Sequence, residues 1–173
     1  MGEWPSAGSM AENEVLNPGF ETWSNSTTAT SWTVAGSGST VNQEAQTSGP
    51  SNYGVFRDDN AARVLSNASD ETTLLQTVTP QVATQRMSAH LGVAVYNTSA
   101  TSVTARIAST NGAVHGGTGW EILTVDATLG EVTTASVGVA IGIGTAFSTF
   151  IDEAIFVVGQ GDGIVPYWEP LSN

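Results

Sequence analysis

The sequence predicts an all-β protein, an antiparallel β-sandwich of the jelly-roll kind with about ten strands. Three observations predict it. No stretch sustains an apolar stripe at helical spacing over three turns, because Gly, Thr and Ser interrupt the chain throughout. Short segments rich in β-branched residues lie between turn signals such as Ser48-Gly-Pro-Ser-Asn and Gly116-Gly-Thr-Gly. Alternation is clear in Val137, Val139 and Ile141, so one face of that strand is expected to pack inward.

The expected strands follow one another between two terminal arms. They cover residues 15–16, 31–35, 40–43, 61–65, 73–78, 87–96, 101–108, 120–127, 136–143 and 149–158. Asn111-Gly is assigned to a turn between two of them. Residues 1–13 are expected to form an N-terminal arm, 14–160 the jelly-roll domain, and 161–173 a C-terminal arm. Pro166 and Pro170 favour an extended chain in that second arm.

The last strand carries two adjacent acids in an apolar run. Simple alternation places one set on one face, namely Phe150, Asp152, Ala154, Phe156 and Val158, and Ile151, Glu153, Ile155 and Val157 on the other. Both faces are largely apolar, which is typical of a central strand. A carboxylate buried there needs a cation or several hydrogen-bond donors. The alternative is that both acids lie at a solvated strand end.

Composition restricts the function. The 173 residues suffice for one domain, hold no cysteine, and carry 16 acids against 4 bases, a net charge of −12. Such a charge repels phosphate backbones and argues against a nucleic-acid partner. No apolar stretch is long enough to span a bilayer, so no membrane partner is expected. No catalytic motif is found, and His90 and His115 are the only side chains suited to act as near-neutral bases, so we expect no enzyme and no catalytic residues.

Several segments, in order, resemble a known group of proteins. The opening Asn17-Pro-Gly-Phe-Glu and the closing Thr149-Phe-Ile-Asp-Glu are the clearest, with Ser31-Trp-Thr-Val between them. Over residues 15–159 the chain resembles galactose-binding-like jelly rolls, in particular the carbohydrate-binding modules related to families 4, 9 and 22. The resemblance implies a structural Ca²⁺ bound by Glu21 and Asp152 with backbone carbonyls, hard oxygen ligands of the kind calcium prefers. The alternative is a hydrogen-bonded pair of acids near the surface.

Glycan binding needs exposed aromatic rings beside polar side chains. The candidate rings are Trp23, Tyr53, Phe56, Tyr96 and Trp120. The resemblance places Phe20 and Trp32 in the core. Trp120 alternates with Ile122 and is also expected in the core. Tyr53, Phe56 and Arg57, in a loop rich in Asn and Asp, are therefore the predicted carbohydrate-binding residues.

Two functions remain open. The first is a structural virion protein, a capsid decoration or a tail or fibre protein, that contacts other copies of itself or a capsid or tail protein. Its arms would dock through Trp4, Tyr167 and Trp168. The chain begins at Met1 without a secretory signal and lacks lysine, which favours this function. The alternative is a free-standing extracellular module that recognises a glycan, and the two functions are compatible.

Overall fold

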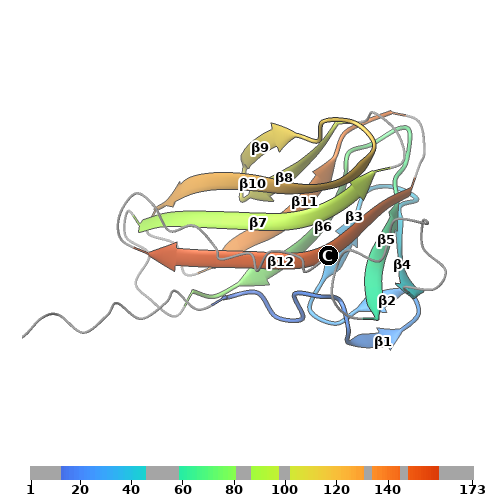
Figure 1. The fold of residues 1–173 in the computed structure, drawn as a ribbon, viewed down its shortest axis with the longest axis horizontal. Helices are drawn as coiled ribbons and strands as arrows, with labels where there is room; N and C mark the ends of the chain where they lie inside the picture. The colour runs from blue at the N-terminus through green and yellow to red at the C-terminus, as the bar shows by residue number, and fades with distance from the viewer. Residues whose placement is uncertain are drawn as a thin grey trace, which may run out of the picture.

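The computed structural model describes residues 13–45, 59–80, 87–97, 102–130, 134–144 and 148–159 (Figure 1). These residues form twelve strands: β1 (Trp23–Asn25), β2 (Thr28–Ala29), β3 (Thr33–Ala35), β4 (Thr40–Ala45), β5 (Asn60–Leu65), β6 (Thr72–Val78), β7 (Met87–Asn97), β8 (Val103–Ile107), β9 (Thr110–Val114), β10 (Gly119–Leu129), β11 (Ala135–Ile141) and β12 (Ser148–Gly159). Within the described ranges no helix is long and apolar enough to cross a membrane.

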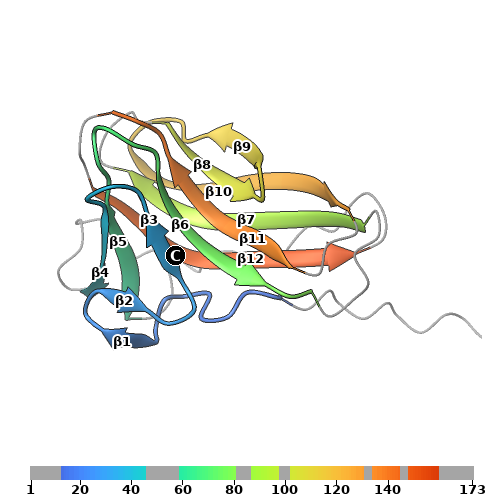
Figure 2. The ribbon, with the colours of Figure 1, turned by 180° about the vertical axis from the view of Figure 1, so that it is seen from behind.

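The strands form two five-stranded antiparallel sheets that face one another. One has the order β10-β7-β12-β5-β4 and lies in front in Figure 1. The other has the order β3-β6-β11-β8-β9 and lies in front in Figure 2. A small β1-β2 hairpin lies beside β4. The predicted all-β sandwich is confirmed. The domain limits at residues 14 and 160 stay a prediction.

The main core fills the space between the sheets. Its largest fully buried side chains include Leu74, Leu91 and Phe156. Phe20 and Trp32 join this cluster, with ring centroids 4.8 Å apart, as predicted. Inward residues alternate with outward ones along the strands, as the pleat of a β-strand requires, except at a bulge in β12.

The Asn-Pro-Gly-Phe-Glu opening is held by side chains that imitate backbone pairing. Asn17 accepts a hydrogen bond from Thr22 N at 2.9 Å and donates to Thr22 O at 2.9 Å. Asn13 lies along β12, where its Oδ1 accepts from Phe156 N at 2.9 Å. Ala154 N donates to Pro18 O at 3.0 Å. The expected strand at residues 15–16 is therefore an irregular segment. The chain around it bonds to β12 after the part of β12 that pairs with β5.

The alternation expected for the last strand is wrong because β12 contains a bulge. Asp152 pairs with Ala94 and Ala154 pairs with Val93, which leaves Glu153 as an extra residue with φ 44°. A bulge residue shifts the side chains after it to the opposite face. Phe150 and Asp152 therefore point outward, whereas Ala154, Phe156 and Val158 join the core.

Three short strands were not predicted: β1, β2 and β9. The expected Asn111-Gly turn is wrong, because both residues lie in β9 and the chain turns earlier, near Ala108 with φ 51°. Gly112 is needed for packing, since a Cβ built on it would lie 2.0 Å from the Thr124 carbonyl oxygen on β10. A close approach between strands explains this glycine better than a turn does.

Candidate functional site

Three aromatic side chains stand in one row on the outer face of the β10-β7-β12-β5-β4 sheet. Trp120 on β10 pairs with Tyr96 on β7, and Tyr96 pairs with Phe150 on β12. The ladder continues from Phe150 to Arg63 on β5 and then to Asn42 on β4. We call Trp120, Tyr96 and Phe150 the aromatic row. Residues distant in the sequence thus form one line across the sheet.

The rings of the aromatic row pack edge to face. The Tyr96 ring centroid lies 5.5 Å from that of Trp120 and 6.0 Å from that of Phe150. With Ala61 these rings form a second apolar cluster, separate from the main core. Trp120 is partly buried in it, so the prediction that Trp120 belongs to the sandwich core is wrong. Trp120 points outward because it shares the parity of Ile122, and Ile122 itself is 40% exposed on that face.

Beyond Phe150 the row becomes polar. The Arg63 guanidinium donates through Nε to Ser148 Oγ at 3.1 Å, and its Nη1 lies 3.7 Å from Glu44 Oε2. Asn42 completes the line at the edge strand. The face therefore offers aromatic rings at one end and hydrogen-bonding groups at the other, a combination that suits sugars, whose apolar ring faces and hydroxyls need both.

His90 and Asp126 form a second polar pair on the same face. They lie opposite one another on β7 and β10, and His90 Nδ1 is 2.6 Å from Asp126 Oδ1. The Asp126 side chain is 82% exposed. His90 lies in a strand, as predicted. The pair adds hydrogen-bonding capacity at the open edge of the sheet.

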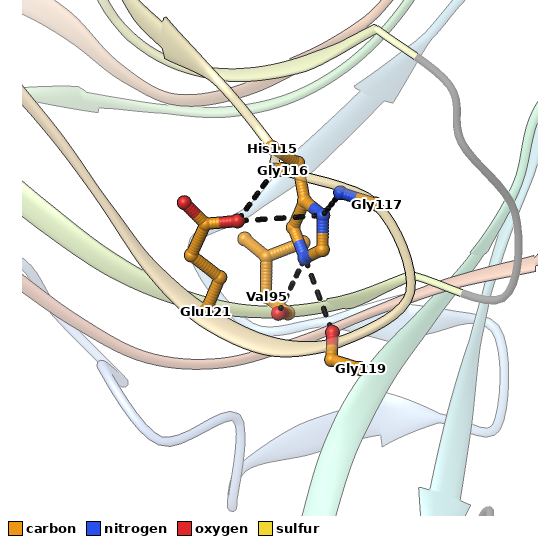
Figure 3. A network of polar contacts seen from close by, with 6 residues as sticks. All are labelled: Val95, His115, Gly116, Gly117, Gly119 and Glu121. Atoms are coloured by element: carbon orange, nitrogen blue, oxygen red, sulfur yellow. Dashed lines mark hydrogen bonds and ion pairs between the residues drawn. The ribbon is translucent and has the colours of Figure 1, made fainter.

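His115 fixes the turn that leads into Trp120 (Figure 3). Its Nδ1 accepts a hydrogen bond from Gly117 N at 3.1 Å, so Nε2 carries the proton and faces Gly119 O at 3.1 Å. Glu121 Oε2 accepts from Gly116 N at 2.6 Å in the same turn. His115 lies in the predicted glycine-rich hairpin. Its ring contacts backbone groups of that hairpin, which is a structural role and not a catalytic one.

Glu21 and Asp152 both lie near the start of β5: Glu21 contacts Asn60, and Ile151, beside Asp152, pairs with Ala62. The Glu21 carboxylate accepts from Asn60 N and Asn60 Nδ2, both at 2.8 Å. Asp152 is 1% exposed and accepts from Glu153 N at 2.8 Å. Among the described residues no group of three His, Asp or Glu is placed to hold a metal ion. Both Glu21 oxygens thus bind Asn60 at the start of β5. Calcium stays a prediction.

The other predicted site residues lie outside the described residues. These are Tyr53, Phe56 and Arg57, predicted to bind carbohydrate, and Trp4, Tyr167 and Trp168, predicted to dock on neighbouring subunits. The loop of Tyr53 connects β4 and β5, two strands of the sheet that bears the aromatic row. Sequence reasoning named Tyr96 as a candidate but missed Phe150 and Arg63, because only the strand register brings them into line.

No protein-family model matches the chain, and no curated protein sequence matches it. Solved structures are similar. The family 61 carbohydrate-binding module TmCBM61, in complex with beta-1,4-galactotriose, has a TM-score of 0.60 at 19% identity, covering 84% of this chain and 98% of the module. The CBM22-1 xylan-binding domain of Paenibacillus barcinonensis Xyn10C has a TM-score of 0.64 at 12% identity, covering 90% and 99%.

A third similar structure is the enzymatically active domain of tailspike protein 4 of Bacteriophage CBA120. Its TM-score is 0.57 at 16% identity, and the match covers 84% of this chain but 21% of that one. At such identities the likeness concerns the fold. The chain has the jelly-roll fold of carbohydrate-binding modules, which confirms that part of the predicted resemblance.

Proposed function

We propose that this protein is a non-catalytic glycan-binding module whose binding face is the outer face of the β10-β7-β12-β5-β4 sheet. The observation that carries the proposal is the aromatic row, in ladder register with Arg63 and Asn42. Neighbouring strands lie about 4.8 Å apart, so a sugar chain running across them meets one side chain after another. Two proteins with this fold are described as binding a galactotriose and xylan, which supports the same ligand class here.

Trp120 is the ring expected to contribute most. It lies on the edge strand, next to the exposed Ile122, and the His115 turn holds its backbone in place. Phe150 is 7% exposed and supports the row from beneath instead of meeting a ligand. Arg63 and Asp126 supply a donor and an acceptor for hydroxyls at opposite ends of the face.

The test is retention of Trp120→Ala by immobilised galactan and xylan, together with a glycan array. We expect affinity to fall about tenfold, equivalent to ~1.4 kcal/mol for one lost ring contact. Val114→Ala is the matched control, because Val114 is an exposed apolar residue on β9 of the other sheet. Equal retention of the two variants, or no retention of the intact chain by any glycan, would count against the proposal.

A structural role in a virion is the second proposal. It is supported by the net charge of −12, the absence of lysine and the fold shared with part of a phage tailspike protein. In this role the chain contacts copies of itself or a capsid or tail protein, through Trp4, Tyr167 and Trp168. Light scattering on the intact chain tests self-association: a defined oligomer that becomes a monomer in Trp4→Ala/Trp168→Ala supports it, and a monomer throughout opposes assembly through these residues.

A further inference from the structure

The outer face of the β10-β7-β12-β5-β4 sheet is open at one edge and closed in the middle. On β10 at the edge, Ile122 and Asp126 are exposed. On the central strand β12, the outward side chains of Phe150, Asp152 and Val157 are buried, and Ile155 between them is half-buried. Outward side chains of a sheet reach solvent unless something lies over them. A central strip of this face is therefore covered.

The covered strip is apolar except for Asp152, whose carboxylate accepts a hydrogen bond from Glu153 N at 2.8 Å. Besides Phe150 and Val157 it includes Ala61 on β5 and Ala94 on β7, both fully buried. Ala61 and Phe150 belong to the second cluster, outside the sandwich core. Burying such a strip stabilises the fold by about 25 cal/mol per Å² only if the covering group is apolar as well. The occupant must therefore be an apolar segment able to lie along a strand.

We propose that the occupant is the chain's own C-terminal segment, residues 164–168, Ile-Val-Pro-Tyr-Trp. The segment follows β12, which ends at Gly159 on this same sheet. Phe150 and Gly159 lie nine positions apart, about 30 Å of strand. Residues 160–173 span up to about 46 Å when extended. After a reversal over residues 160–163, the segment reaches back about 16 Å beside Val157 and Ile155, and residues 169–173 add about as much again, which carries the chain to Phe150.

The composition of the segment suits this course. Gly161 and Gly163 permit a reversal directly after the strand. Pro166 favours an extended backbone and has no N–H group that burial would leave unpaired. Tyr167 and Trp168 add large apolar surfaces with polar tips. These two aromatics would then pack on the covered strip of their own molecule, in contrast to docking on a neighbouring subunit.

A spin label tests the placement without altering the aromatics. The chain has no cysteine, so Ser172→Cys gives one labelling site in the full-length protein. A nitroxide there is expected to broaden the amide resonances of β5, β7 and β12, while one at Val114→Cys broadens those of β8 and β9. Absent broadening, or broadening confined to the other sheet, overturns the inference. In a second sample, an isotope-labelled chain without a nitroxide is mixed with a nitroxide-labelled chain without the isotope. Broadening in this sample identifies a second copy as the occupant and also overturns the inference.

Side-chain accessibility gives an independent test. In Tyr167→Ser/Trp168→Ser, hydroxyl-radical modification of Phe150 should rise several-fold over the intact chain, because the tail loses the two aromatics that anchor it. Tyr53→Ser/Phe56→Ser is the matched control, because residues 46–58 connect β4 and β5 of the same sheet. A rise in this control and none in the tail variant overturns the inference.

One consequence rests on the proposed function. If glycans bind this face, the C-terminal segment competes with them, and Tyr167→Ser/Trp168→Ser should bind glycan more tightly. If Phe150 modification rises and glycan retention stays unchanged, the placement of the segment is supported. Only the proposal that glycans bind this face is then weakened. The two failures are therefore distinguishable.

Discussion

Among the side chains that hold the opening segment, Gln76 is the one whose loss should lower the free energy of unfolding most. It is 2% exposed in β6, and its amide imitates a strand partner for Leu16. Nε2 donates to Leu16 O and Oε1 accepts from Leu16 N, both at 2.8 Å. Gln76→Met keeps the volume and removes both hydrogen bonds. The free energy of unfolding should fall by about 2–4 kcal/mol, because two partly buried backbone groups lose their partners.

The assay is urea unfolding of the intact chain and two variants. Gln43→Met is the matched control: Gln43 donates to Asn60 Oδ1 at 3.0 Å on an exposed strand, so its loss should change stability by about 0.5 kcal/mol or less. The slope with denaturant should stay the same in both variants, since the fold is unchanged. A Gln76→Met protein within about 1 kcal/mol of the parent would refute the reasoning that this amide acts as a strand partner.

Three further predictions concern other parts of the sandwich. Gly138→Ala should destabilise the fold by more than ~3 kcal/mol in denaturant unfolding, because its Cβ would lie 2.1 Å from a backbone oxygen of β6, whereas Gly130→Ala, with nothing within 4 Å, should be nearly neutral. Hydrogen bonds from Arg106 lower the pKa of Glu71 despite partial burial, and its charge assists. Glu71→Gln should therefore cost up to ~1 kcal/mol at pH 7, a difference that shrinks below about pH 4.5 and disappears below the folded pKa. Millimolar calcium should raise the melting temperature of the parent over chelator and leave that of Glu21→Gln unchanged.

Each of these has a clear contrary result. Equal unfolding of the two glycine variants would mean that β6 and β11 can separate without cost. A Glu71→Gln penalty that persists unchanged at pH 3 would assign the effect to packing and not to the ion pair with Arg106. A melting temperature that ignores calcium would leave Glu21 as the partner of Asn60 and nothing more.

The sandwich could be predicted because each strand carries its own local signal. Alternation along residues 136–141 and the turn at Gly116-Gly-Thr-Gly depend on neighbours in the chain, and both are found in the structure. The bulge at Glu153 could not be predicted, since an extra residue in a strand leaves the composition of the run unchanged. The short β9 was missed because Asn-Gly also suits a tight turn.

The aromatic row could not be predicted from the sequence for a different reason. Trp120, Tyr96 and Phe150 come from three strands, and their alignment depends on the pairing register between β10, β7 and β12. Alternation within one strand assigns a parity but not which of the two faces is inside. Trp120 was therefore given the correct parity with Ile122 and the wrong side of the sheet.

The extra residue in β12 divides this strand between two apolar clusters. Before Glu153, positions 150 and 152 face away from the main core, and Phe150 packs within the aromatic row. After it, positions 154, 156 and 158 fill the space between the sheets, where changes alter stability. Deleting Glu153 would merge the two frames and turn Phe156 toward solvent. A substitution before Glu153 therefore acts on the outer face of the sheet, whereas one after it acts on the main core.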